Sequence, residues 1–166
     1  DYFSVLNGVK QGGVISPILF CIYIDDLLIK LKMSGVGCFV GSNFTGALAY
    51  ADDIVLLAPS PSAMRKLLTI CDEYATQYDI IFNADKSKFL VFAAHKRRSL
   101  YQSMCACKFY IGSRVIDNVS KYSHLGHIIT ASFDDADDIG HRRNSFIGQA
   151  NNLFCCFSKV DLLTKL

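Results

Sequence analysis

The chain has 166 residues, of which 51% are hydrophobic and 19% are charged. This length is enough for one hydrophobic core and short for two full domains, and Asp or Lys interrupts every apolar stretch before it reaches the length of a membrane span. The 17 basic and 15 acidic residues give a net charge of +2, which by itself is only weak support for a nucleic-acid partner. We therefore expect a soluble, globular protein.

The first residues, DYFSVLNGVKQGG, contain no initiator methionine, basic leader or apolar signal core, so we expect a fragment of a longer polypeptide. The seven cysteines lack the spacing of a zinc finger or a small disulfide framework, which favours reduced thiols in an intracellular compartment. A zinc site of Cys105, Cys107, His124 and His127 is the less favoured alternative. Packed thiols and turn histidines are the simpler interpretation.

Ser16 and Pro17 predict the start of a helix that extends to about Lys32, because serine can cap a helix and proline suits its first turn. The segment is apolar on nearly every side, which predicts burial on several sides. Turn-rich segments then flank a short apolar run at residues 38–40, where we expect an edge strand. The run ALAYADDIVLLA, residues 47–58, predicts a β-hairpin with its two aspartates at the tip.

A second helix is predicted from Ser60-Pro61, again a serine followed by a proline. The residues at helical spacing, expected to pack on the sheet, are Met64, Leu67, Leu68, Cys71, Ala75 and Tyr78. A turn at residues 83–86, a strand and a basic loop, HKRRS, follow. Strands are predicted at residues 108–111 and 114–119, before the segment YSHLGHIIT. The helical spacing of Ile139, Phe146, Ala150, Leu153 and Phe157 predicts a last helix from Asp137.

The chain contains two Asp-Asp pairs, in YIDD at residues 23–26 and in YADD at residues 50–53. Asp25 and Asp26 fall in the middle of a helix, where neighbours point about 100° apart, and Asp26 can pair with Lys30 one turn later. Asp52 and Asp53 instead lie at a hairpin tip beside a dry core, where charge is costly unless it is solvated, paired or bound to a metal. An ordinary hairpin turn remains the alternative for the second pair.

Three stretches in this order, GVKQGGVISPILF, AYADDIVLL and FNADKSKFLVF, resemble the palm of reverse transcriptases, especially those of non-LTR retrotransposons. Residues 9–17 resemble the QG-x-x-x-SP motif of the family, residues 50–53 its YxDD catalytic turn, and residues 83–87 its N-x-x-K-[ST] motif. Residues 124–126, His-Leu-Gly, stand where the family has its YLG primer grip. The resemblance spans residues 3–130, and the last helix is only loosely similar to the thumb of the family.

The resemblance implies template-directed nucleotidyl transfer, in which the primer 3′-hydroxyl attacks the α-phosphate of a dNTP and pyrophosphate leaves. It implies Mg²⁺, or Mn²⁺ in its place, held by carboxylates, with Asp52 as the first ligand candidate and Asp53 as the second. Gln11 and Gly12 would lie against the nascent base pair, and Lys86 near the triphosphate, where an ammonium group can help protonate the leaving pyrophosphate. A flexible turn and a solvated lysine are the alternatives for these last residues.

Two basic clusters are candidates for contacts to the nucleic-acid backbone: Lys96, Arg97 and Arg98, and Arg142 with Arg143. A solvated surface explains charge runs of this size about as often. Four acidic residues are expected at the N-terminal end of the last helix, where negative charge suits the helix dipole: Asp134, Asp135, Asp137 and Asp138.

We expect an α+β fold: a polymerase palm-like antiparallel sheet with helices packed on one face over residues 1–130, followed by the start of a thumb-like helical segment over residues 131–166. The family has a further catalytic aspartate and its fingers upstream of the QG motif, so we expect both in the same polypeptide and the isolated chain to be inactive. The expected partners are an RNA template, a DNA primer and dNTPs, without a membrane, in the nucleus or the cytoplasm.

Two other functions stay open at this point. A decayed or repurposed retroelement remnant would keep the packing of the palm and bind nucleic acid without catalysis. An unrelated metal-dependent phosphohydrolase has only the Asp-Asp pair in its favour, and it leaves the QG-x-x-x-SP stretch unexplained.

Overall fold

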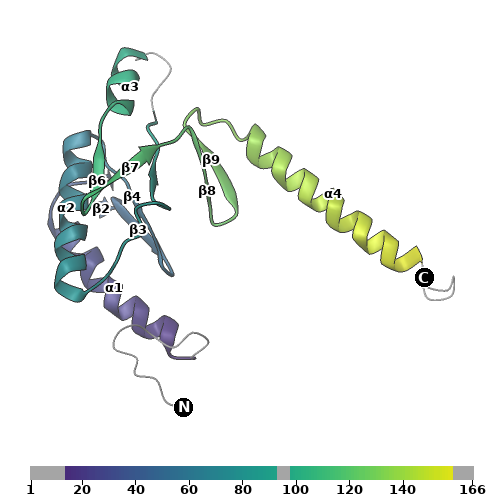
Figure 1. Ribbon diagram of the computed structural model, residues 1–166, viewed down its shortest axis with the longest axis horizontal. Coiled ribbons are helices and arrows are strands. Elements are labelled where there is room, and N and C mark those ends of the chain that lie inside the picture. The colour runs from purple at the N-terminus through teal and green to yellow at the C-terminus, as the bar shows by residue number, and fades with distance from the viewer. Residues whose placement is uncertain (1–13, 93–97, 159–166) are drawn as a thin grey trace. The chain divides into compact units, whose positions relative to one another are not determined.

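The computed structural model describes residues 14–92 and 98–158 (Figure 1). Contacts divide the chain into two units, of which the first comprises the residues up to Lys86 and Cys107–Ile116, and the second comprises Ser87–Ala106 and the residues from Asp117 onward. Both contain helices and short strands that pair mostly antiparallel. The α+β class predicted from the sequence is therefore confirmed.

Helix α1, Ser16–Met33, has almost the predicted bounds, and a proline stands in its first turn. Its N-cap residue is Ile15, and no side chain makes a capping hydrogen bond there. The predicted capping role of Ser16 is therefore wrong by one position, since this serine is already helical. The helix ends with Lys30 and Lys32 in its last turn, where positive charge suits the dipole.

One face of α1 is buried and the opposite face is not. The buried residues recur every three or four positions, and they are Ile24, Leu27 and Leu31. On the other side Ile22 is 64% exposed. The prediction of burial on several sides is therefore wrong within the described part of the chain, because only one stripe of this apolar helix meets other described elements.

Two β-hairpins follow α1. Strand β1, Phe39–Val40, pairs antiparallel with β2, Asn43–Phe44, so the expected edge strand forms with a partner that the sequence did not predict. Strand β3, Ala47–Tyr50, pairs antiparallel with β4, Asp53–Leu56, as predicted.

Helix α2, Pro61–Tyr78, begins as predicted. The hydroxyl of Ser60 accepts a hydrogen bond from the Ala63 N–H at 3.2 Å, so this serine is a true N-cap. The helix ends at Asp79, whose φ of 54° is the left-handed conformation common at helix C-termini.

The core of the first unit forms between α1 and α2, which Figure 1 shows side by side. Leu27 and Leu31 pack with Leu67, Cys71 and Tyr74, and the three leucines are fully buried. Burying one such leucine contributes roughly 1.5–3 kcal/mol. The hairpin residues that pack against this cluster are Ala47, Ile54 and Leu56. Both helices therefore lie on the same face of the β3–β4 hairpin, as the sequence predicts.

Strands β6, Phe109–Ile111, and β7, Arg114–Asn118, form a further antiparallel hairpin that begins in the first unit. The turn between them is tied to α2, because the Gly112 N–H donates to both carboxylate oxygens of Asp72, at 3.0 and 3.1 Å. The guanidinium of Arg65 lies 5.6 Å from the centre of the Phe109 ring, a second contact between α2 and this hairpin.

In the second unit, strand β5, Lys88–Phe89, runs parallel to the last two residues of β7. The Lys88 ammonium lies 2.6 Å from the Asp117 carboxylate across this ladder. Helix α3, Arg98–Cys105, was not predicted, since its first residues belong to a run that reads as a basic loop. The described strands thus form several small ladders, one of them parallel, instead of the single sheet that the sequence suggests.

The chain continues with the hairpin of β8, Lys121–His124, and β9, His127–Thr130, and then helix α4, Ala136–Ser158. Figure 1 shows α4 as one uninterrupted helix. It begins one residue before the predicted start. None of the described residues of α4 is buried, and Phe146 is 71% exposed, so the described part of the second unit leaves the apolar residues of this helix uncovered. The division into palm and thumb at residue 130 stays a prediction.

Candidate active site

The two adjacent aspartates of YADD lie at the tip of the β3–β4 hairpin. Tyr50 pairs with Asp53 across the ladder, which leaves Ala51 and Asp52 as a two-residue turn. Ala51 has a φ of 51°, the left-handed conformation that such turns need at their first position. The predicted position of the pair is confirmed, with Asp52 in the turn and Asp53 as the first residue of β4.

The alternation of side chains along β4 decides which way Asp53 faces. Ile54 and Leu56 pack toward the two helices, so Asp53 and Val55 belong to the opposite face of the hairpin. On that face Tyr50, the cross-strand partner of Asp53, is 67% exposed. The hairpin therefore presents a carboxylate and an aromatic ring side by side, away from the helices.

Both aspartates are exposed. Solvation therefore accounts for the cost of their charge, and the fold requires neither a counter-ion nor a metal at this tip. The turn instead fixes the position of the two carboxylates: both are held in solvent at the end of a hairpin that packs on the two helices through one face.

The other Asp-Asp pair lies on the surface of α1, as the sequence predicts, and Asp25 and Asp26 are both exposed. The expected ion pair between Asp26 and Lys30 is not among those of the described residues. The Lys30 ammonium instead donates to the side-chain oxygen of Gln77 at 2.9 Å and lies 5.0 Å from the centre of the Tyr74 ring. The lysine thus joins the two helices by a tertiary contact.

Lys86 belongs to a separate turn of the first unit. The side-chain oxygen of Asn83 accepts the Lys86 backbone N–H at 3.1 Å, which closes the predicted turn. The neighbouring Asp85 pairs with Arg114 of β7 at 2.9 Å. Asn83 is therefore explained by the turn, while the exposed Lys86 side chain is the group that this turn presents.

Several predicted site residues lie outside the described residues: Gln11, Gly12, Lys96 and Arg97. Arg98 opens α3, and only its backbone is described. Arg142 and Arg143 are exposed residues of α4, in the second unit. The structure thus brings Asp52 and Asp53 together at one turn, with Lys86 elsewhere in the same unit.

The predicted acidic N-terminus of the last helix is confirmed, with Asp137 and Asp138 in the first turn of α4. The carboxylate of Asp134 accepts the Ala136 N–H at 3.0 Å, just before the helix begins. A hydrogen bond from the Ile128 backbone N–H lowers the pKa of the Asp138 carboxyl to about 2, with further stabilisation from Arg142. No pattern in the sequence predicts this contact between helix and hairpin.

Within the parts of the chain that the structure describes, no three His, Cys, Asp or Glu side chains gather where they could hold a metal ion. The zinc alternative at Cys105, Cys107, His124 and His127 is therefore wrong for these residues. Asp52 and Asp53 offer two carboxylates without a third ligand among the described residues.

No described helix has both the length and the apolar character that a membrane span needs.

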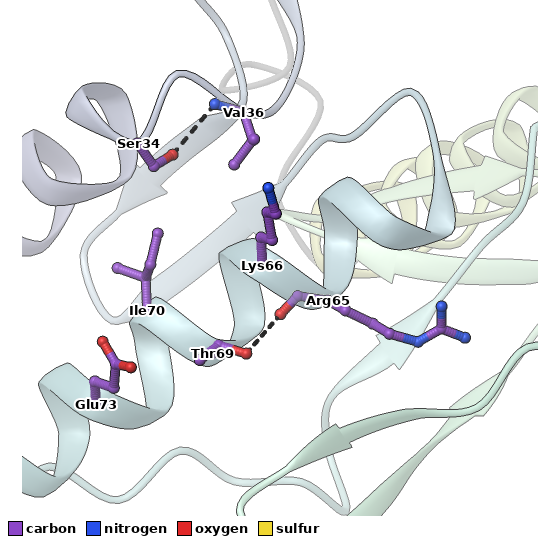
Figure 2. Close-up of a pocket in the computed structure, with 7 residues that line it drawn as sticks. All are labelled: Ser34, Val36, Arg65, Lys66, Thr69, Ile70 and Glu73. Carbon is purple, nitrogen blue, oxygen red and sulfur yellow. Dashed lines mark hydrogen bonds between the residues drawn. The ribbon is translucent and has the colours of Figure 1, made fainter.

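The first unit also contains an open cavity of about 360 Å³ between α2 and the loop after α1 (Figure 2). Val36 and Ile70 supply its apolar wall, and Lys66 and Glu73 carry opposite charges on the same side of α2. In Figure 2 the side chain of Arg65 extends away from these two, consistent with its contact to β6. None of the predicted site residues lines this cavity.

A family comparison excludes one of the functions that the hairpin tip leaves open. The family model described as reverse transcriptase (RNA-dependent DNA polymerase) matches residues 2–129. The chain belongs to the reverse transcriptase family. This match covers the QG-x-x-x-SP stretch, the YADD turn and the N-x-x-K-S turn together, so an unrelated phosphohydrolase is excluded.

Individual relatives point to non-LTR retrotransposons. The chain is 34% identical over 147 residues to the Retrovirus-related Pol polyprotein from type-2 retrotransposable element R2DM of Drosophila melanogaster, a match of 84% of this chain and 14% of the relative. It is 26% identical over 168 residues to the RNA-directed DNA polymerase from mobile element jockey of Drosophila funebris, which covers 96% of this chain and 17% of the relative. The resemblance to reverse transcriptases of this kind is therefore confirmed, and the chain spans a small part of the length of these relatives.

Proposed function

We propose that these residues form the part of an RNA-directed DNA polymerase that carries its catalytic turn. The proposed reaction joins a dNTP to the 3′-hydroxyl of a DNA primer on an RNA template. The observation that supports it is the β3–β4 tip, where Asp52 and Asp53 stand exposed above a hairpin whose other face is packed on helices. Such an open face gives a nucleic-acid end room to approach the carboxylates.

The donor chemistry of this tip fits a hard divalent cation. Carboxylate oxygens are the ligands that Mg²⁺ prefers, and Mn²⁺ accepts the same set, so Asp52 and Asp53 would hold the ion. When bound, such ions stabilise the charge on the attacking and leaving oxygens of a phosphoryl displacement. The short turn keeps both carboxylates at the same edge of the hairpin, and the left-handed Ala51 makes that turn possible.

Other residues would bind the substrates. Lys86 places an ammonium group on an ordered turn, where it suits the triphosphate. Gln11 and Gly12 are proposed to contact the nascent base pair, and the turn at Leu125 and Gly126 the primer end. The basic residues proposed to contact phosphates of the primer or template are Lys96, Arg97, Arg98 and Arg143. Arg142, the other predicted candidate, is less suited to this role because its guanidinium is already paired with Asp138 at 3.0 Å.

We further propose that the isolated chain does not polymerise. Two carboxylates are fewer ligands than a two-ion site needs, and the described residues contain no third. The missing ligand and the fingers would come from other segments of the same polypeptide, which is consistent with the 14% of the R2DM polyprotein that the chain spans.

The test is primer extension on an RNA template by a longer polypeptide that contains these residues. Asp52→Ala is expected to lower kcat by roughly a hundredfold or more, because it removes a ligand that stabilises transition-state charge. Asp25→Ala is the matched control, since it removes the same side chain from the other Asp-Asp pair on the surface of α1. Equal activity of Asp52→Ala and Asp25→Ala would contradict the proposal.

A non-catalytic remnant that binds nucleic acid is the second candidate, favoured by the absence of a third metal ligand among the described residues. It predicts that binding of a primer–template duplex survives Asp52→Ala and that no longer polypeptide extends a primer. Magnesium-dependent extension that Asp52→Ala abolishes excludes this candidate.

A further inference from the structure

The β8–β9 hairpin is tied to the start of α4 by one carboxylate. Asp138 accepts the Ile128 backbone N–H at 2.9 Å through one oxygen and the Arg142 Nε–H at 3.0 Å through the other. The second oxygen also lies 3.3 Å from Nδ1 of His127. The Asp138 side chain is only 16% exposed, so water competes little for these contacts.

Arg142 extends the same link to the turn of the hairpin. It stands one helical turn after Asp138, and one of its terminal nitrogens lies 3.4 Å from the carbonyl oxygen of Gly126 and 2.8 Å from the ring nitrogens of His127. The carboxylate and the guanidinium thus hold an amide of β9 and a carbonyl of the turn at the same time. Since both partners are backbone groups, the link fixes the path of the hairpin itself.

Helix capping does not explain Asp138. The Ala136 N–H at the start of α4 donates to the side chain of Asp134. Asp137, in the first turn with Asp138, already provides a negative charge that suits the helix dipole. The partner of Asp137 is the side chain of Lys121 at 3.3 Å, and both of these side chains are more than half exposed. Asp138 differs from Asp137 in being shielded and in bonding to the hairpin backbone.

The turn that this link holds is itself unusual. Leu125 and Gly126 have φ values of 49° and 77°, and a leucine rarely adopts the left-handed conformation. Leu125 is 49% exposed, so the hairpin presents an apolar side chain at its tip. A strained turn persists only where surrounding contacts stabilise it. Asp138 and Arg142 provide such contacts by bonding to the backbone of Ile128 and Gly126.

We propose that Asp138 is a positioning residue, which fixes the Leu125–Gly126 turn on α4 and thereby sets where this turn meets the primer. The role in primer contact rests on the proposed polymerase function, whereas the link between turn and helix does not. The proposal therefore has two separate readouts, of which only the second needs activity.

The first readout is amide hydrogen exchange at Ile128 in the chain itself, at neutral pH. Asp138→Ala is expected to speed this exchange about tenfold, the effect of losing one charge-assisted hydrogen bond. Asp138→Asn keeps an oxygen that can accept the Ile128 N–H but loses the negative charge, so the exchange rate at Ile128 is expected to lie between those of the unchanged chain and Asp138→Ala. This variant replaces Asp138→Ala in the test if the alanine variant folds poorly. The control is Asp137→Ala, expected to change the rate by less than about twofold. Unchanged exchange in Asp138→Ala, or the same rise in Asp137→Ala, would overturn the link.

The second readout is primer extension by the longer polypeptide. Asp138→Ala is expected to raise the KM for the primer–template about tenfold with kcat changed less than about twofold, since the residue touches no reacting atom. Partial rescue of KM by Asp138→Asn is expected, and Asp137→Ala should leave KM unchanged. Faster exchange at Ile128 with an unaltered KM would overturn the positioning role. If no variant and no parent polypeptide extends a primer, the proposed function fails, and the exchange result still decides the link.

Discussion

Ala51 holds a strained conformation at the point where the two aspartates turn. Its φ of 51° lies in the left-handed region, which costs an L-residue with a Cβ roughly 1–2 kcal/mol and a glycine almost nothing. Ala51→Gly is therefore expected to raise the free energy of unfolding by up to ~1 kcal/mol, after the entropy that glycine adds to the unfolded chain. Urea denaturation of both proteins measures the difference.

Ala49→Gly is the control for this change. Ala49 lies two residues earlier in β3 and has ordinary strand geometry, so glycine there brings only its entropic cost, and the free energy of unfolding should fall by roughly 0.5–1 kcal/mol. Equal destabilisation by both glycines would show that Ala51 is not strained.

Cys71 is a buried thiol whose proton the fold retains. Burial in the core, with a smaller contribution from Asp72, raises the pKa of the Cys71 thiol from 9.0 to about 12. The native state therefore binds this proton more tightly than the unfolded state, and its contribution to stability is complete below about pH 9 and lost as the pH rises from about 9 to 12. Since the thiolate is the nucleophile, Cys71 should also react far more slowly than exposed Cys21.

The measurement is labelling of the native chain with a thiol reagent at pH 8, followed by mass spectrometry of the peptides. Modification of Cys21 within minutes is expected, with Cys71 modified only after denaturant is added. Cys155 is a second exposed control, on α4. Equal labelling of Cys71 and Cys21 in the native chain would contradict its burial.

At the scale of elements, the loop into β3 depends on a close approach at Gly46. A Cβ built there would stand 2.4 Å from the ring of Phe44 and 3.1 Å from the backbone nitrogen of Cys38. Because Phe44 packs against the core of the first unit, the ring cannot simply move away. Gly46→Ala is expected to lower the free energy of unfolding by roughly 1–3 kcal/mol.

A glycine with room beside it provides the contrast. A Cβ at Gly140 in α4 meets nothing within 4 Å, so Gly140→Ala should stabilise that helix by about 0.8–1.0 kcal/mol. Circular dichroism during thermal unfolding distinguishes the two substitutions. If Gly46→Ala were as harmless as Gly140→Ala, the packing of Phe44 on the loop would be wrong.

The elements that were predicted correctly are those whose start or turn is marked by a short sequence motif. Ser60-Pro61 marks the start of α2, and two apolar runs around Asp52-Asp53 mark the hairpin with its turn. Helix α3 was not predicted, because it has only eight residues and its first two belong to the run HKRRS, which reads as a basic loop. Leu125-Gly126 likewise lacks the Asn-Gly or Asp-Gly pair by which a hairpin turn is usually found.

The residues of the candidate site also differ in whether the sequence predicts them. Asp52 and Asp53 are predictable because one short motif contains both residues and the turn that presents them. The bond from Asp138 to the Ile128 amide is not predictable, since it joins residues ten positions apart through a backbone group that carries no sequence signal. The positions of the two Asp-Asp pairs already favoured the hairpin pair over the one in α1. The resemblance to reverse transcriptases added what position alone did not, namely that this hairpin turn is a catalytic candidate and not an ordinary turn.

At the scale of the whole molecule, charge limits how strongly the chain can attract a polyanion. The net charge of +2 is small, so binding to nucleic acid has to depend on a few local cations. Arg143 is an exposed residue of α4, whereas the guanidinium of Arg114 is already paired with Asp85 at 2.9 Å. A phosphate contact at Arg143 releases a counterion from the duplex, and an arginine already paired with a carboxylate contributes much less.

Arg143→Ala is therefore expected to weaken binding of a primer–template duplex and to lower the slope of log K against log salt by about 1. The measurement is a titration of the duplex at several salt concentrations, with Arg114→Ala as the control that leaves the slope nearly unchanged. An equal loss of slope in both variants would mean that the charge of the whole chain, and not its distribution, governs binding. An unchanged slope in Arg143→Ala would remove this part of α4 from the nucleic-acid interface and leave the hairpin turns as the contacts to test.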